Sequence, residues 1–391
     1  MTNPDWRASV TATERYDKIQ NIQLGIDKNA AAAEGKSAFA IETEAYTASS
    51  SREEYENACD ILRNASKPAS NDENDSPSFT PAARHGSEMA ESGVRIGTHQ
   101  NCQYIASGVT AEVYRCDTRA FKVIVETHNI APHDPVRESR ILAELSRPCI
   151  PLLETFRDHE QRLVLVFPYM PLSLEEQLQQ KGEAGLTPER IRSHFRDVFT
   201  ALRQIHGKSI IHRDIKPSAI LLKSPDGPAY LADFGTAWHP QLSCATEPQD
   251  AKILDIGTGP YRAPEVLFGD KGYGTAVDMW GAGAMLVECC RPSHVPLFES
   301  RAAHEDGNQL GLILSIFKTI GSPTAETWPE AVNFKTPPFR MYQTIQGKTW
   351  DDILDGVQPD FADLVRAMIK YESKTRVTAA QVSRGEFISS F

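Results

Sequence analysis

Hydrophobic residues in the first 64 positions of the chain recur every three or four residues, the spacing that lines one face of an α-helix. Three runs show this pattern, and their apolar positions are Tyr16, Ile19 and Ile22, then Ala38, Ile41, Ala45 and Ala48, then Tyr55, Ala58, Cys59 and Leu62. The first and third runs open with the capping-box sequences TATE at 11–14 and SREE at 51–54, and the second extends over about 30–48. Because single short helices are marginal in water, the pattern predicts a small three-helix bundle over residues 1–64 that shares one core.

The pattern changes twice after this segment. Residues 65–97 are rich in Ser, Pro, Asp, Glu and Asn and nearly lack large apolar residues, so they are predicted to form a disordered linker. From residue 98 to residue 391 the apolar runs are strand-like first and helix-like later. One of them, LVLVF at 163–167, is the continuous apolar run of a buried strand. This order indicates a β-rich part followed by a helical part.

The composition restricts the classes of function. The chain has 391 residues and a net charge of −11, which disfavours direct binding of nucleic acid because phosphate neutralisation needs a basic surface. The sequence contains no run of about 18 apolar residues, so no membrane span is predicted. Residues 1–10 are polar and lack the apolar core of a secretory signal. The seven cysteines are scattered without a CxxC pair, which indicates reduced thiols in the cytosol or nucleus rather than disulfides or a zinc site.

Four short motifs follow one another in the larger part of the chain. Residues 211–216 read IHRDIK, 233–235 read DFG, 263–265 read APE and 278–283 read DMWGAG. Each match alone has little weight, but chance does not explain the ordered set at these spacings. The set resembles the signature of eukaryotic protein kinases, and the resemblance extends from about residue 98 to the end. It implies an α+β bilobal protein-kinase fold, with a small β-rich lobe, a large helical lobe, and ATP and Mg²⁺ bound between them.

The resemblance assigns phosphoryl transfer, which needs positioning and charge neutralisation, to five side chains. Asp214 is expected to accept the proton of the substrate hydroxyl or to orient that hydroxyl, and Lys216 to neutralise the γ-phosphate, as in Ser/Thr kinases. Asp233 is expected to hold Mg²⁺. Lys122, in a strand-like run, is the candidate for the α- and β-phosphates, with Glu138 as its partner on a helix. The alternative that these are ordinary surface charges does not account for the ordered motifs.

Further positions are expected to shape the ATP site. They are Ala106, Ser107 and Gly108 in the phosphate loop, Val113, Ala120 and Leu221 around the adenine, Phe167 as gatekeeper, and Pro168 and Met170 in the hinge. Pro168 is compatible with the hinge because proline removes only a donor, whereas the first adenine contact there needs a carbonyl. Arg213 and Thr258 are assigned to the regulation of the activation segment, which is the stretch between the DFG motif at 233–235 and the APE motif at 263–265. Glu265 is expected to form a structural ion pair with Arg376.

Several segments indicate a group within the kinases. Residues 316–329, which read IFKTIGSPTAETWP, resemble the insert of cyclin-dependent kinases, and YRAPE at 261–265 is similar to the same group. The glycine-poor phosphate loop and GTGP at 257–260 resemble the fungal monomeric CDK-activating kinases. This resemblance implies a protein substrate, the activation-loop threonine of a cyclin-dependent kinase. The expected location, from the reduced thiols, is the nucleus, the cytoplasm or both. Only the last three residues of PHDPVRE at 132–138 resemble the cyclin-binding helix, which weakens the case for a cyclin partner.

Two departures from the kinase pattern indicate a weak kinase or, as the alternative, a pseudokinase. The phosphate loop, IASGVTAEV at 105–113, keeps only Gly108 of three expected glycines, which is expected to lower the affinity for ATP. Ala219 stands where the pattern has the Asn that binds Mg²⁺, and losing that ligand is expected to reduce the rate on the order of 10²–10³-fold unless water or Ser218 compensates. The alternative to an active enzyme is a pseudokinase scaffold whose lobes serve only as docking surfaces.

A third departure lies in the activation segment. Counting back from 263–265 places Ile253 where an activating phosphothreonine would sit, and Arg213 is the residue that would meet that phosphate. Asp250 and Asp255 flank this position, so one of these carboxylates could pair with Arg213 instead. We therefore expect that the segment does not need phosphorylation. The alternative is that these acids simply lie in a solvated loop.

Three stretches of the N-terminal bundle carry a separate resemblance. They are DWR at 5–7, AY at 45–46 and SSSREEY at 49–55. They resemble the KIX domain of a fungal Mediator tail subunit. The resemblance implies an apolar groove that receives the amphipathic helix of a transcription activator and so recruits the kinase. The alternative is a generic helical extension that packs on the main domain.

Overall fold

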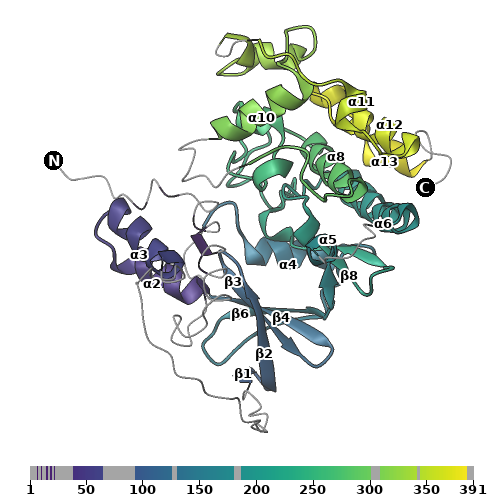
Figure 1. The fold of residues 1–391 in the computed structure, drawn as a ribbon. Helices are drawn as coiled ribbons and strands as arrows, with labels where there is room; N and C mark the ends of the chain where they lie inside the picture. The colour runs from purple at the N-terminus through teal and green to yellow at the C-terminus, as the bar shows by residue number, and fades with distance from the viewer. Residues whose placement is uncertain are drawn as a thin grey trace, which may run out of the picture.

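The computed structural model shows two lobes with a small group of helices beside the β-rich lobe (Figure 1). It describes residues 7, 10, 15, 18, 19 and 22 and the ranges 38–64, 93–125, 130–179, 186–300, 309–340 and 344–384. The two-lobed α+β architecture expected from the sequence is confirmed. The small lobe supplies one wall of the candidate site.

The small lobe is an antiparallel sheet with the strand order β1-β2-β3-β4-β6-β5. Its strands are β1 (Val94–Ile96), β2 (His99–Ser107), β3 (Ala111–Cys116), β4 (Arg119–Ile124), β5 (Glu154–Arg157) and β6 (Leu163–Pro168). Phe121, Val123, Val164 and Val166 are fully buried and form the centre of this lobe. β6 is the buried strand that the LVLVF run predicts.

Strand β1 corrects the predicted end of the linker. Residues 94–96 were expected to belong to the linker, but Val94 pairs with Cys102 and Ile96 with His99 in the sheet. Ile96 is buried in the core of the small lobe, because its side chain points to the inner face of the hairpin. The ordered domain therefore begins before residue 98. Residues 65–92 lie outside the described residues.

Helix α4 (Pro135–Ala143) packs beside the sheet and carries Glu138. Its start follows from local chemistry, because the Asp134 side chain accepts a hydrogen bond from the Arg137 amide at 2.8 Å and proline occupies the first turn. The Asp134 amide in turn donates to the carbonyl oxygen of Gly235 at 3.0 Å. The helix is thereby tied to the DFG segment of the other lobe.

The large lobe is helical. Its helices are α5 (Leu174–Gln179), α6 (Pro188–Gly207), α7 (Pro264–Leu267), α8 (Ala276–Cys290), α10 (Leu310–Ile320), α11 (Trp350–Ile353), α12 (Pro359–Met368) and α13 (Ala379–Ser383). Short 3₁₀ segments connect them, namely η3 (Pro217–Ala219), η4 (Phe234–Thr236), η5 (Gly259–Tyr261), η6 (Pro329–Asn333), η7 (Pro338–Arg340) and η8 (Ser373–Thr375). A small second sheet is formed by β7 (Leu172–Ser173), β8 (Ile220–Leu222) and β9 (Ala229–Leu231). It lies next to residues 211–219, which begin with the IHRDIK motif and are called the catalytic loop below.

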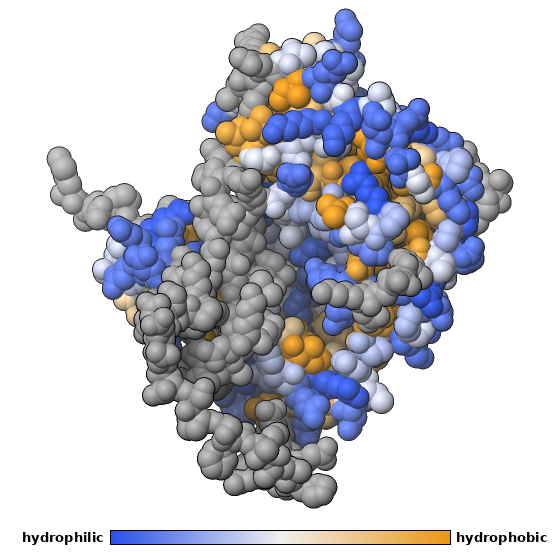
Figure 2. Space-filling view, viewed as in Figure 1, coloured by the Kyte–Doolittle hydropathy of each residue, from blue (hydrophilic) through white to orange (hydrophobic). Residues whose placement is uncertain are grey.

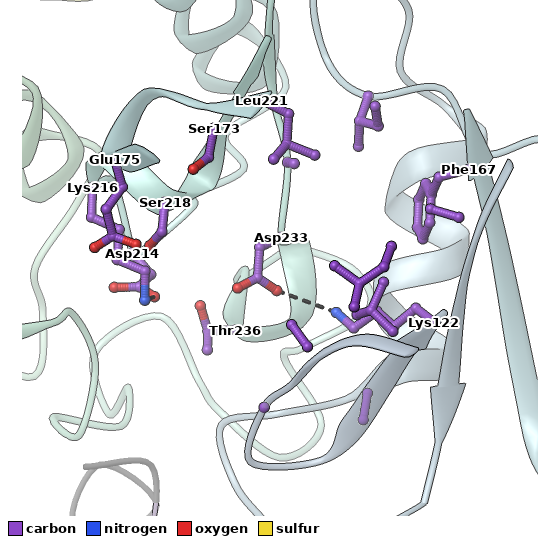
Figure 3. Close-up of a pocket in the computed structure, with 18 of the residues that line it drawn as sticks. Lys122, Phe167, Ser173, Glu175, Asp214, Lys216, Ser218, Leu221, Asp233 and Thr236 are labelled. Carbon is purple, nitrogen blue, oxygen red and sulfur yellow. Dashed lines mark hydrogen bonds and ion pairs between the residues drawn. The ribbon is translucent and has the colours of Figure 1, made fainter. Parts of the chain in front are cut away.

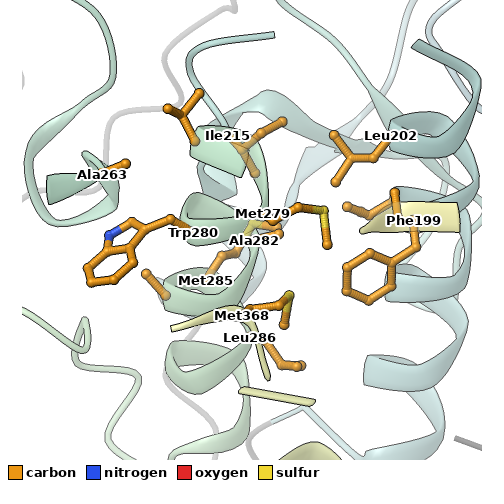
Figure 4. Close-up of a cluster of buried hydrophobic side chains, with 14 of the residues drawn as sticks. Phe199, Leu202, Ile215, Ala263, Met279, Trp280, Ala282, Met285, Leu286 and Met368 are labelled. Atoms are coloured by element: carbon orange, nitrogen blue, oxygen red, sulfur yellow. The ribbon is translucent and has the colours of Figure 1, made fainter. Parts of the chain in front are cut away.

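Helix α8 forms the centre of the large lobe because its sequence is apolar on all sides. Figure 4 shows its side chains together with Phe199 and Leu202 of α6 and Met368 of α12 in one buried cluster. Gly283 permits this close approach, since a Cβ atom there would lie 2.9 Å from the side chain of Ile369. Asp278 of the same helix accepts hydrogen bonds from the backbone of the catalytic loop, so α8 helps to position the site.

The N-terminal helices share a small core of their own. Helices α2 (Ala38–Ala48) and α3 (Arg52–Asn64) pack around Ile19, Ile22, Tyr55 and Cys59, which are all buried. Inside this core the Arg15 guanidinium and the Tyr55 hydroxyl both donate to the carboxylate of Glu42, at 2.8 Å each. Val125, at the end of β4, packs against the same cluster.

The second and third predicted helices are found as α2 and α3, with residues 30–37 outside the described residues. Most of the first predicted helix, Tyr16 included, also lies outside the described residues, so that helix stays a prediction. The resemblance to a KIX domain is not tested by these contacts and stays a prediction. All seven cysteines are free thiols, as the sequence indicates. In the part of the chain that the structure describes, no helix has the length and apolar character needed to cross a membrane. The face in Figure 2 is largely hydrophilic over the large lobe, with apolar side chains in separate small groups.

Candidate active site

A cavity of about 480 Å³ lies between the two lobes, within the usual range for a small-molecule site. The predicted site residues that line it are Ala106, Ser107, Gly108, Val113, Ala120, Lys122, Glu138, Phe167, Pro168, Met170, Asp214, Lys216, Leu221, Asp233 and Thr258. Arg213 is the one predicted residue that does not line it. The fold therefore brings together residues that are far apart in the sequence, while their roles toward ATP stay predictions.

Lys122 connects the two lobes at the back of this cavity. Its Nζ lies 2.9 Å from both carboxylate oxygens of Glu138 on α4 and 3.2 Å from Oδ1 of Asp233. Figure 3 shows Asp233 between Lys122 and the group formed by Asp214, Lys216 and Ser218. Burial alone would lower the pKa of Lys122, but the neighbouring carboxylates of Glu138 and Asp233 outweigh it and raise the pKa above the usual range.

The charge of Asp233 is favoured in the same way. The Lys122 ammonium holds the pKa of Asp233 far below its ordinary value, despite the opposing effect of burial. An ionised carboxylate with further oxygen donors from Ser218 and Thr236 on the cavity wall suits a hard cation such as Mg²⁺. Among the described residues no group of three or more His, Cys, Asp or Glu side chains is arranged to hold a metal ion by itself. The phosphates of a nucleotide and water would therefore have to supply most of the ligands.

Asp214, Lys216 and Thr258 form a closed set of hydrogen bonds on the opposite side of the cavity. The Nζ of Lys216 lies 2.7 Å from Oδ2 of Asp214 and donates to the hydroxyl of Thr258 at 2.9 Å. The Thr258 hydroxyl donates to Oδ1 of Asp214 at 2.7 Å. Thr258 was assigned to regulation from the sequence. In the structure its hydroxyl contacts both Asp214 and Lys216 and fixes the orientation of these two side chains, while its regulatory role stays a prediction.

The catalytic loop is anchored by Asp278 of α8. Its carboxylate accepts hydrogen bonds from the amides of His212 and Arg213 at 2.9 and 2.8 Å and lies 2.9 Å from Nε2 of His206. Arg213 has φ = +74°, a left-handed conformation that is unfavourable for a side-chain-bearing residue. The two amide bonds to Asp278 hold the loop in this conformation, immediately before Asp214.

Ala219 offers the cavity no polar group. It is buried, its amide donates to the carbonyl of Lys216 at 3.0 Å, and its own carbonyl accepts from the amide of Ala232 at 2.9 Å. The backbone of this position is thus fully used inside the loop. A second metal ion would have to find its ligands elsewhere, as the sequence indicates.

Two functional candidates escaped the sequence analysis. His133 lines the cavity near Asp233, and burial lowers its pKa to about 4, so it is neutral at physiological pH. Glu247 is buried in the activation segment and pairs with Arg213, its Oε2 at 2.5 Å from Nη1. Neither position carries a signal in the sequence that separates it from nearby polar residues.

The expected partner of Arg213 was therefore wrong in detail. Asp250 is exposed and Asp255 lies 3.6 Å from the guanidinium of Arg262, whereas Glu247 is the carboxylate that meets Arg213. In contrast, the expected ion pair of Glu265 is confirmed. Both its oxygens accept from Arg376, at 2.6 and 2.8 Å, in a fully buried site.

The comparisons with known proteins agree with this geometry. Residues 100–388 match the protein-family model described as "Protein kinase domain". Serine/threonine-protein kinase CAK1 of Saccharomyces cerevisiae is 33% identical over 277 residues, which cover 59% of this chain and 75% of that protein. Serine/threonine-protein kinase csk1 of Schizosaccharomyces pombe is 30% identical over 285 residues, or 70% of this chain and 89% of that protein.

A vertebrate relative and a solved structure extend the likeness. Cyclin-dependent kinase 7 of Carassius auratus is 30% identical over 307 residues, covering 75% of this chain and 84% of that protein. A chain of the crystal structure of the yeast RNA Pol II CTD kinase CTDK-1 complex superposes with a TM-score of 0.61 at 21% identity, over 80% of this chain and 96% of the other, which shows the fold. The chain therefore belongs to the protein kinase family, as a serine/threonine kinase of the group that contains the cyclin-dependent kinases.

Proposed function

We propose that this kinase transfers the γ-phosphoryl group of ATP to a threonine in the activation loop of a cyclin-dependent kinase. The observation that supports catalysis is the assembled set of charges in the cavity. Lys122 is paired with Glu138, and Asp214 is held by Lys216 and Thr258 within hydrogen-bond distance. The substrate class is supported by the glycine-poor phosphate loop and the GTGP stretch, which resemble those of fungal CDK-activating kinases.

In the proposed reaction, Asp214 orients the substrate hydroxyl and accepts its proton as the oxygen attacks the γ-phosphorus. The bond from that phosphorus to the β-γ bridging oxygen breaks, and ADP leaves. Lys216 neutralises the charge of the transferring phosphoryl group, and Thr258 keeps Asp214 and Lys216 in register. Lys122 binds the α- and β-phosphates. Mg²⁺ bound with ATP supplies further charge neutralisation, and Asp233 is the residue that would hold it.

The hinge geometry is consistent with adenine binding. The amide of Tyr169 donates to the carbonyl of Thr118 at 2.8 Å, so it serves the fold and not a ligand. The residues on either side, Pro168 and Met170, line the cavity. We propose that the Pro168 carbonyl and the backbone of Met170 hydrogen-bond the adenine edge, and that Phe167 closes the space behind it.

The direct test is a phosphorylation assay with the purified full chain, Mg²⁺-ATP and a cyclin-dependent kinase whose activation loop is unphosphorylated. We expect phosphate on the activation-loop threonine of the substrate, located by mass spectrometry. The matched control is Asp214→Asn, which keeps the size of the side chain and removes the base, and which is expected to lose at least 10²-fold in rate. Transfer by Asp214→Asn at the wild-type rate would refute the assigned mechanism.

Ala219 favours a second candidate function, a scaffold without catalysis. In this case the wild-type chain transfers no phosphate, and Ala219→Asn, which restores an oxygen ligand, produces activity. In the case of an active enzyme, the wild type transfers phosphate and Ala219→Asn changes the rate and its dependence on free Mg²⁺. Nucleotide binding is measured separately from the shift in melting temperature with Mg²⁺-ATP, so the two functions give distinguishable results.

A further inference from the structure

Glu247 occupies a buried position where three parts of the kinase meet. Its side chain is 2% exposed. Oε2 accepts from Nη1 of Arg213 at 2.5 Å, and Oε1 accepts from Nη2 of the same guanidinium at 3.2 Å. Oε1 also lies 3.5 Å from Nη1 of Arg137, and Oε2 accepts from the amide of Ile253 at 3.1 Å. Two-point contact with a guanidinium is among the strongest charge-assisted arrangements in proteins.

The three partners belong to the three elements that must be aligned for phosphoryl transfer. Arg213 directly precedes Asp214 in the catalytic loop. Arg137 lies on α4 directly before Glu138, the partner of Lys122. Ile253 belongs to the activation segment, at the position where the motif spacing places an activating phosphothreonine. One carboxylate therefore connects the catalytic loop, the helix that carries Glu138, and the activation segment.

The charges of this cluster need the carboxylate. Arg137 and Arg213 are both buried, and the pKa of Arg137 is lowered by its burial and by the neighbouring charge of Arg213. Burial by itself would raise the pKa of Glu247, but the hydrogen bond and charge of Arg213 outweigh it and hold the pKa below the usual range. Removing the negative charge would leave two like charges close together out of water, which is strongly unfavourable.

The backbone around the carboxylate is also fixed. The indole of Trp238 donates to the carbonyl of Glu247 at 2.9 Å, and the hydroxyl of Tyr273 donates to the carbonyl of Ile253 at 2.6 Å. Kinase activation segments are commonly ordered when an added phosphate pairs with arginine. Here Ile253 has no hydroxyl to modify, its amide is already bonded, and the arginine already has an anionic partner.

We propose that Glu247 is a positioning residue that takes the place of an activating phosphate, so that the activation segment, the catalytic loop and α4 are aligned without phosphorylation of this chain. This inference rests on the proposed kinase function for its kinetic consequences. Its structural consequence, the ordering of the activation segment by the Glu247 carboxylate, is independent of the proposed kinase function.

The test compares Glu247→Gln with Asp250→Asn in the full chain. Both changes replace a carboxylate of the same segment by its amide, but Glu247 is buried and Asp250 is exposed. We expect Glu247→Gln to lower kcat by at least tenfold and to raise the KM for ATP severalfold, because α4 loses its link through Arg137. Asp250→Asn is expected to stay within twofold of wild type. Phosphatase treatment of the wild type is expected to leave its activity unchanged.

Hydrogen exchange on the same proteins separates this inference from the proposed function. Faster exchange of residues 247–258 in Glu247→Gln, with α8 unchanged, supports the ordering role even where the wild type transfers no phosphate. Glu247→Asp, which keeps the charge, is expected to recover part of both readouts and serves if the amide variant folds poorly. Wild-type kinetics and exchange in Glu247→Gln, or loss of wild-type activity on phosphatase treatment, would overturn the proposal.

Discussion

Asp278 is the side chain on which the catalytic loop depends most, and its replacement by asparagine gives a sharp prediction. The carboxylate is completely buried in α8 and contacts the amides of His212 and Arg213 and the imidazole of His206. Asparagine has nearly the same shape, so the change removes one acceptor oxygen and the charge without creating a cavity. The NH₂ group that replaces this oxygen faces a backbone donor in either orientation of the amide.

The size of the effect follows from these contacts. A hydrogen bond to a charged group contributes about 1.5–3 kcal/mol, and a buried donor left without an acceptor costs about 1–3 kcal/mol more. His206 can accept from the new amide and offset part of this loss. We therefore expect Asp278→Asn to lower the free energy of unfolding by about 3 kcal/mol. Because the Arg213 backbone is held at φ = +74° by the same carboxylate, Asp214 should also shift, and kcat is expected to fall on the order of 10²-fold.

Urea unfolding followed by tryptophan fluorescence measures the stability, and the phosphorylation assay measures the rate. The matched control is Asp363→Asn on α12, where the exposed carboxylate pairs with Arg366 at 3.0 Å and the change should be too small to resolve from wild type. If Asp278→Asn unfolds at the same urea concentration as the control and keeps its rate, the loop is not anchored in the way described.

Three further predictions concern stability. Burial raises the pKa of Glu288 to about 7, so the contribution of the protonated side chain to stability is present below pH 4.5 and is lost as the pH rises toward 7. The variant Glu288→Gln can still accept a hydrogen bond from the Tyr261 hydroxyl but carries no charge. It should therefore raise the melting temperature at pH 8 and not at pH 4.5, by an amount equivalent to about 3 kcal/mol at most. Glu265→Gln leaves the buried guanidinium of Arg376 without its counter-charge and should lower the free energy of unfolding in urea by about 3–5 kcal/mol. Adding Arg376→Met to that variant should recover part of this loss. An undiminished loss in the double variant would contradict the ion-pair explanation. Gly281→Ala would place a Cβ 2.9 Å from a main-chain carbonyl oxygen of the catalytic loop, so we expect a loss of about 1–3 kcal/mol together with a lower rate, and a wild-type rate would show that the loop can move away freely.

The sequence by itself determined the parts of this protein that depend on local order. Helical spacing and a capping box located α3, and a continuous apolar run located β6. The candidate catalytic residues were assigned from motifs that follow one another in a fixed order along the chain. The structure brings two of them, Lys122 and Asp233, together from 111 positions apart. The ion pair of Glu265 and Arg376, also 111 positions apart, was found in the same way.

Only the tertiary structure decided which acid meets Arg213 and which side chains Thr258 contacts. The sequence does not distinguish the carboxylates of Glu247, Asp250 and Asp255 as partners of Arg213. In the structure only the carboxylate of Glu247 is buried against two guanidinium groups. Hydrophobic periodicity predicts which face of a helix or strand is buried. It does not predict which residue pairs with a polar side chain in an irregular segment. That partner is set by contacts between distant segments, where burial strengthens the attraction between opposite charges and makes an unpaired charge costly.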